Sequence, residues 1–149
     1  MKKTVTPLRS LCAALAALVL LVALAVPAFA AENGFADLYY RMNDNAQVLT
    51  EDENSELEAL LEELSVRQSF DVVIVTIDSL ESEGYTSMEE YADDTYDYCQ
   101  FGYGADRDGV LLLVSTGDRK WHISTCGYGI TAFTDAGIQY LGEQMTPDM

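Results

Sequence analysis

Basic residues are scarce in this chain. Its 149 residues include 8 Lys and Arg against 25 Asp and Glu, which gives a formal net charge of −17. A surface of this sign repels nucleic acid and anionic lipid, and it attracts cations and basic partners. We therefore expect no nucleic-acid partner. We interpret most of the acids as a solvated surface that keeps the protein soluble.

Signatures of common catalytic sites are also missing. His122 is the only histidine. It lies on the more polar face of a predicted strand near the sheet edge, where a surface role is favoured over catalysis or metal ligation. The segment Gly127 to Phe133 lacks the lysine of a phosphate-binding loop and the full glycine spacing of a dinucleotide fingerprint. No serine stands in a nucleophile elbow.

Only one long apolar run occurs, and it lies near the N-terminus. Basic residues at positions 2, 3 and 9 precede the apolar run from Leu11 to Val26, and Ala28 to Ala30 gives a small-x-small pattern. This order predicts a secretory signal peptide over residues 1–30, with a retained membrane anchor as the alternative. Removal of that segment leaves 119 residues with 5 basic residues and all 25 acids, a net charge of −20. We expect an exported, extracytoplasmic protein of one small domain.

Cysteine is also rare. Cys12 lies inside the apolar run without the spacing of a lipoprotein cleavage site. Cys99 and Cys126 could pair outside the cytoplasm. Cys99 also fits the buried stripe of a predicted helix, where a thiol packs well. Both alternatives stay open.

The first part of the mature chain predicts a lead-in and then a helix. Residues 31–42 have little periodicity and are expected to form an extended lead-in. Thr50 and Glu53 have the spacing of a capping box. Leucines at positions 57, 60, 61 and 64 follow at helical spacing and predict one buried stripe.

Two buried strands and a second helix come next. Asp71 to Ile77 is an unbroken β-branched run, which predicts a strand covered on both faces, and Val110 to Ser115 predicts another. Between them, Ser87 and Glu90 repeat the capping spacing. The apolar stripe of that helix contains Met88, Tyr91, Ala92, Thr95 and Cys99.

The last part predicts a returning strand and a third helix. Lys120 to Cys126 alternates, with Trp121 on its apolar face, and should pair antiparallel beside the second strand, near the sheet edge. Thr134 is placed to cap a helix that presents Ile138, Leu141 and Met145 to the core. The order of elements predicts an α/β fold, a three-layer α/β/α sandwich with a central mixed β-sheet. The first two strands should run parallel, joined through the second helix.

This topology places several acids near one rim of the sheet. Asp106 and Asp108 precede the second strand, and the returning third strand brings the start of the last helix, with Asp135, to the same end. Carboxylates in glycine-rich loops are ligands that calcium or magnesium accepts. The alternative, which the residues alone favour, is that Asp106 and Asp108 shape a turn while Asp135 is a first-turn helix acid.

Four stretches of the chain together resemble a known family. They are "MNDNAQVLTEDENSELEALLEEL", "DVVIVTIDSL", "TSMEEYADDTYDYCQFGYGADRDGVLLLVS" and "RKWHISTCGYGITAFTD". In combination they are similar to the TPM domain, from residue 43 to residue 149. The resemblance implies the same three-layer fold. Carried over position by position, the acidic site of the family would fall on Asp44, Asp106, Asp108 and Asp135, holding Ca2+ or Mg2+.

The resemblance also implies a range of functions. Plant members of the family are described as acid phosphatases and as helpers of photosystem repair, and animal members as receptor accessory subunits. Similar bacterial members commonly continue into a transmembrane helix and a glycine-rich tail. We therefore expect a domain truncated at its C-terminus, anchored to the membrane through a segment beyond Met149. The expected function is a binding or accessory module for a membrane or envelope protein, and the alternative is a weak metal-assisted acid phosphatase acting on phosphomonoesters.

Overall fold

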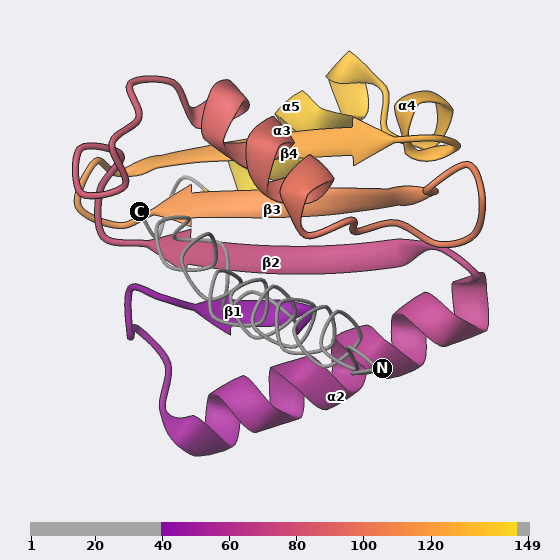
Figure 1. Cartoon of the computed structure of the whole chain (residues 1–149), viewed down its shortest axis with the longest axis horizontal. Helices are drawn as coiled ribbons and strands as arrows, with labels where there is room; N and C mark the ends of the chain where they lie inside the picture. The colour runs from indigo at the N-terminus through magenta and orange to yellow at the C-terminus, as the bar shows by residue number, and fades with distance from the viewer. Residues whose placement is uncertain (1–39, 146–149) are drawn as a thin grey trace, which may run out of the picture. The chain divides into compact units, whose positions relative to one another are not determined.

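The computed structural model describes residues 40–145, and the predicted signal peptide and most of the predicted lead-in lie outside them. Four strands form one sheet in the order β1-β2-β3-β4 (Figure 1). β1 (Met42–Asp44), β2 (Asp71–Ile77) and β3 (Gly109–Ser115) are parallel to one another. β4 (Lys120–Cys126) returns antiparallel to β3. The predicted mixed sheet is confirmed.

Within residues 40–145, four helices accompany the sheet. They are α2 (Glu51–Gln68), α3 (Met88–Tyr98), α4 (Gly129–Ala132) and α5 (Asp135–Met145). α2 begins at the predicted capping box, in which the Thr50 hydroxyl accepts from the Glu53 amide and the Glu53 carboxylate accepts from the Thr50 amide. The Ser87 hydroxyl caps α3 by accepting from the Glu90 amide. The cap residues therefore fix where both helices start.

The helices lie on both faces of the sheet. α3 crosses one face in front of β3 and β4, and α5 lies behind them (Figure 1). The Ser124 hydroxyl of β4 donates to Asp93 of α3 at 2.5 Å. On the other face Gly142 of α5 contacts the Trp121 ring, and the Val72 amide at the start of β2 donates to Ser65 of α2 at 3.0 Å. The three-layer α/β/α sandwich is confirmed.

The two faces of the sheet are buried to different extents. On the α3 side, Val73, Val75, Ile77, Leu111 and Leu113 have no exposed surface. Each such side chain contributes about 1.5–3 kcal/mol through its removal from water. Several of their alternates on the α2 and α5 side are only half-buried, among them Ile74, Leu112 and Ile123. The tightest core thus lies between the sheet and α3.

Two predicted buried stripes were too wide. Leu60 of α2 is 59% exposed and Leu141 of α5 is 39% exposed. α2 packs mainly against β1 and β2 at the border of the sheet, so only a narrow line around Leu61 reaches the core. On α5 the close contact is made by Gly142, which lets the helix backbone approach Trp121.

The pattern of β4 was also misjudged in part. The predicted alternation is present, but Ser124 on the polar face is buried against α3, while Trp121 on the apolar face is half-exposed. The sequence predicted neither β1 nor α4. A three-residue strand and a four-residue helix are too short for any periodicity to indicate them.

Gly142→Ala should destabilise the domain by about 1–3 kcal/mol, because a Cβ at this position would run into the Trp121 ring. The matched control is Gly137→Ala on the same helix. Its Cβ would meet only the Thr134 hydroxyl at 3.5 Å, so helix propensity should make that change neutral or stabilising. Thermal unfolding followed by the fluorescence of the single tryptophan measures both. Equal unfolding temperatures for the two variants would contradict the packing.

Candidate functional site

The sheet register separates Asp44 from two of the other predicted site residues, Asp106 and Asp108. Asp44 ends β1 opposite Thr76, at the carboxyl end of the parallel strands. Asp106 and Asp108 precede Gly109, which lies opposite Asp71 at the amino end. The five steps from residue 71 to residue 76 span roughly 16 Å. Asp44 and the pair Asp106 and Asp108 therefore lie at opposite ends of the parallel strands.

Asp44 holds the connection between β1 and α2. One carboxylate oxygen accepts from the Thr76 hydroxyl at 2.5 Å and from the Val48 amide at 3.2 Å, and the other accepts from the Leu49 amide at 2.8 Å. Partial burial raises the pKa of Asp44, but these hydrogen bonds outweigh it and the pKa lies below its ordinary value. The Asp44 carboxylate thus has a structural role: it accepts hydrogen bonds from backbone amides and a hydroxyl of its own domain.

Asp106 and Asp108 belong to a tight loop from Tyr103 to Asp108. Its two ends form an antiparallel bridge, in which the Tyr103 amide donates to the Asp108 carbonyl and the Asp108 amide donates to the Tyr103 carbonyl. Gly104 and Arg107 have positive φ angles of 72° and 53°. Asp106 is exposed at the tip. The motif "DRDG" is therefore the closing half of a compact turn.

Arg107 fastens this loop to the end of α3. Its guanidinium donates to the carbonyls of Tyr96 and Phe101, at 2.7 and 2.9 Å, and forms an ion pair with Asp97 at 2.8 Å. The same group stacks 5.1 Å from the centre of the Tyr96 ring. The bond to Tyr96 adds a second donor to a carbonyl of the last turn of α3, which has no partner within the helix, and the bond to Phe101 holds the segment that follows the helix. The arginine between the two aspartates is thus a cap.

Asp108 joins the loop to the segment after β4. Its carboxylate accepts from the Tyr128 amide at 2.6 Å. Gly127 has a φ of 57°, and a Cβ there would run into the Asp108 carboxylate. A glycine is required here both by the backbone conformation and by this close approach. The two glycine-rich segments therefore meet, as the topology predicted.

Asp71 is the carboxylate that the sequence analysis missed at this edge. It is 6% exposed, and it accepts from Arg41 at 2.7 Å and from the Gly102 amide at 2.8 Å. The sequence signal that could have indicated this role was a charged residue at the start of a buried strand. Arg41 was the matching signal, because it is the only basic residue between positions 10 and 66.

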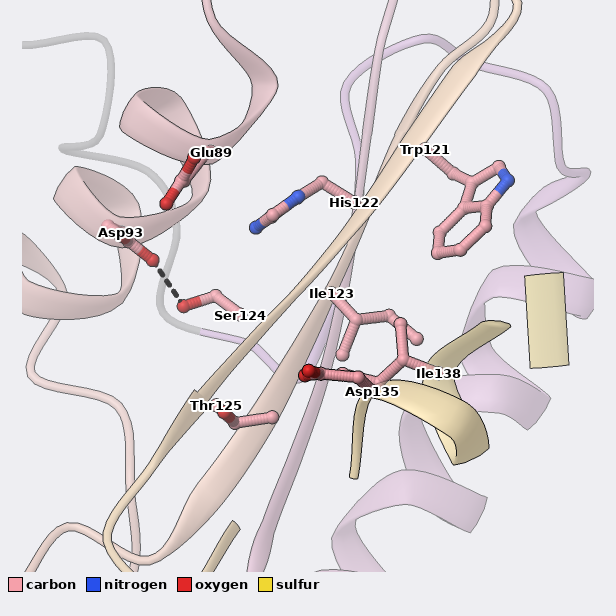
Figure 2. A pocket seen from close by; sticks show the side chains of 9 residues that line it. All are labelled: Glu89, Asp93, Trp121, His122, Ile123, Ser124, Thr125, Asp135 and Ile138. Atoms are coloured by element: carbon pink, nitrogen blue, oxygen red, sulfur yellow. Dashed lines mark hydrogen bonds between the residues drawn. The ribbon is translucent and has the colours of Figure 1, made fainter. Parts of the chain in front are cut away.

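Asp135 lines a cavity of about 490 Å³ at the edge of β4 (Figure 2). Residues of β4 and of the two flanking helices line it: Glu89, Asp93, Trp121, His122, Ile123, Ser124, Thr125, Asp135 and Ile138. Figure 2 shows Glu89, Asp93 and His122 on the α3 side of the strand, and Trp121 and Asp135 on the other side. The cavity therefore reaches both faces of β4.

Asp108 lines a second cavity, of about 440 Å³, at the amino end of β2. This cavity is mainly apolar, and Phe70 and Phe133 stack within it with ring centres 6.0 Å apart. Asp108 and Asp135 thus line different cavities. Within residues 40–145, no group of three or more His, Cys, Asp or Glu side chains has the geometry to hold a metal ion.

Two further findings concern the cysteines and possible membrane-spanning helices. Cys99 and Cys126 are both thiols, so the disulfide alternative does not apply to this structure, and burial raises the pKa of Cys99. In the part of the chain that the structure describes, no helix has both the length and the hydropathy to cross a membrane.

Asp44→Asn should cost about 1–2 kcal/mol of stability at neutral pH, because it removes a charged hydrogen-bond acceptor. The folded pKa of Asp44 lies below its ordinary value, because partial burial disfavours the charged carboxylate less than the Thr76, Val48 and Leu49 hydrogen bonds favour it. Its contribution is therefore present above the unfolded pKa and is lost as the pH falls through the folded pKa. Urea unfolding at about pH 6 and about pH 3 measures the cost, which should shrink in acid.

The exposed Asp106→Asn change is the matched control, with an expected cost within about 0.5 kcal/mol at either pH. If the Asp44→Asn cost were the same at both pH values, the hydrogen-bonded carboxylate would not be the source of stability.

The first of two similar solved structures has the same fold as this chain. The N-terminal domain of a P. gingivalis protein, solved by solution NMR, has a TM-score of 0.61 at 19% identity, over 74% of this chain and 69% of that chain. The N-terminal domain of the cg2496 protein from Corynebacterium glutamicum has a TM-score of 0.49 at 13% identity, over 72% and 70%. No curated protein matches the chain. The model of the TPM domain matches residues 42–149, and the chain belongs to the TPM domain family.

Proposed function

We propose that this domain acts outside the cytoplasm as a binding or accessory module for membrane or envelope complexes. The observation that carries the proposal is the cavity at β4. It opens along the outer edge of a strand, between two helices that bear acids, and mixes carboxylates with apolar side chains. An open strand edge with such walls is suited to recognition of another chain.

The polar groups of this cavity favour recognition over hydrolysis. Ser124, Asp93 and His122 supply the residue types of a catalytic triad, but the Ser124 hydroxyl donates to Asp93 at 2.5 Å. A serine nucleophile is activated by a histidine that accepts its proton, with the carboxylate behind that histidine. The observed bond instead ties β4 to α3.

The acids of the "DRDG" loop also support a binding module. The alternative function, a weak metal-assisted phosphatase, requires a nucleophile and a general acid placed around one phosphoryl group. Asp108 accepts from the Tyr128 amide, and Asp106 is exposed at the tip of the loop. These positions suit residues that shape a turn.

A calcium or magnesium ion at this loop stays a prediction. Calcium takes about six to eight oxygen ligands. Asp106 and Asp108 supply two carboxylates, so backbone carbonyls of the neighbouring glycine-rich segments would have to provide the remainder.

The extracytoplasmic location is proposed from the N-terminal pattern of the sequence. The net charge of −20 that remains after removal of the predicted signal peptide bears on how such a domain would meet a membrane. Anionic headgroups would repel this surface. Contact with a membrane complex would therefore pass through a protein partner or an anchor.

The test is turnover of p-nitrophenyl phosphate by the purified protein, with calcium or magnesium and with a chelator. We expect no turnover above the protein-free rate, because the described acids are arranged to hold loops. Metal-dependent turnover that Asp108→Ala or Asp106→Ala abolishes would overturn the binding-module proposal. A calcium-dependent rise in unfolding temperature without turnover would support a metal-stabilised module.

A further inference from the structure

β4 is an open edge of the sheet. It pairs with β3 along its whole length, from Lys120 opposite Ser115 to Cys126 opposite Gly109, with no slip in register. Among the described residues, no other strand pairs with its outer side. Alternate amides and carbonyls along that side therefore point away from the sheet, in the arrangement that an added strand would need.

β4 has few of the features that usually prevent strand addition. Proteins protect an edge with a very short strand, charged side chains, a proline, a bulge, or a covering helix or loop. β1, at the opposite edge, is protected by its length of three residues. β4 has seven residues, contains no proline, and carries its one formal charge at its first position, Lys120.

The walls beside β4 differ in chemistry. The α3 wall presents Glu89 and Asp93, which lie one turn apart on the helix, beside His122 (Figure 2). The α5 wall presents Ile138 beside Trp121 and Ile123, with Asp135 at the start of the helix. One wall is thus acidic, and the other is mainly apolar.

An added strand would alternate its side chains between these walls. Successive residues of a strand point to opposite faces. Residues facing α3 would meet two carboxylates, which favours Lys or Arg. Residues facing α5 would meet Trp121, Ile123 and Ile138, which favours apolar side chains.

We propose that the outer edge of β4 binds an extended segment of another protein in which basic residues alternate with apolar ones. The segment adds a fifth strand to the sheet through backbone hydrogen bonds, and the two walls select its side chains. This proposal rests on the binding-module function and names the chemical class of the partner.

Charge argues for a foreign partner over a second copy of this chain. Pairing β4 with its own symmetry mate would bring two sets of Glu89, Asp93 and Asp135 close together, and each chain has a net charge of −17. Like charges placed together in this way oppose association. The same negative charges would attract a basic segment.

The experiment uses a synthetic peptide of about seven residues in which lysine alternates with valine. Trp121 is the only tryptophan and lines the cavity at β4 (the groove between the α3 and α5 walls), so its fluorescence reports binding directly. We expect saturable binding that weakens with added salt. A peptide with glutamate in place of lysine should not bind.

Backbone methylation of the peptide tests strand addition itself. Methyl groups on the alternate amides that face β4 would remove its hydrogen bonds, whereas methyl groups on the other set would point to solvent. One methylated peptide should therefore lose at least roughly tenfold in affinity, and the other should bind nearly as well as the parent.

Substitutions at two neighbouring acids of α3 test whether the acidic wall contributes to peptide binding. Glu89→Gln should weaken binding roughly two- to fivefold, because it removes one charge from the groove. Glu90→Gln is the matched control, since both residues lie in the first turn of α3 and Glu90 does not line the groove. The affinity of the Glu90→Gln variant for the lysine peptide should be unchanged.

Three results would overturn the proposal. Both methylated peptides could bind equally well, so that no strand is added. The glutamate peptide could bind as tightly as the lysine peptide, so that charge does not select the segment. Sedimentation could show a stable dimer that the lysine peptide does not dissociate, so that a second copy occupies the edge. None of these results affects the turnover test of the binding-module function.

Discussion

The buried carboxylate of Asp71 is the interaction on which the amino end of the sheet depends. It holds the Arg41 side chain on one side and the Gly102 amide on the other, while the Asp71 backbone amide donates to the Asp108 carbonyl. The segment before β1, the start of β2 and the loop before β3 are thereby brought to one place. A carboxylate that is 6% exposed needs such partners, because an unpaired buried charge is strongly destabilising.

The position of β4 follows from this arrangement. The loop held by Asp71 and Arg107 sets where β3 begins, and β4 then pairs with β3 residue by residue up to Cys126 opposite Gly109. Asp108 fastens the segment just after β4 through the Tyr128 amide. The acids of the "DRDG" region thus build the frame, while the groove that we propose for binding lies along the far side of β4. The frame and the binding surface use different residues, so substitutions can separate them.

Much of the fold could be predicted because its signals are local. The β-branched run at Asp71 to Ile77 and the caps at Thr50 and Ser87 specify their elements through neighbouring residues alone. β1 could not be predicted, since three residues become a strand only by pairing with β2. The exposure of Leu60 was missed for a similar reason, because helical spacing defines a stripe and only the packing partner defines its width.

The candidate site was harder to predict than the fold. The contact of the Asp108 loop with Gly127 and Tyr128 could be predicted, because the antiparallel return of β4 ends where β3 begins. The role of Asp71 depends on Arg41, thirty positions away, and no local pattern joins them. The groove at β4 depends on which strand lies at the edge and on which helix flanks each face. Those are properties of the assembled sheet.

The central claim is that the outer side of β4 is open. Amide hydrogen exchange along β3 and β4 in the unbound protein tests it most directly. If the edge is open, alternate amides of β4 exchange rapidly with solvent, while the amides of β3, which is paired on both sides, exchange slowly. Uniformly slow exchange along all seven residues of β4 would contradict the account, because it would mean that the edge is already covered.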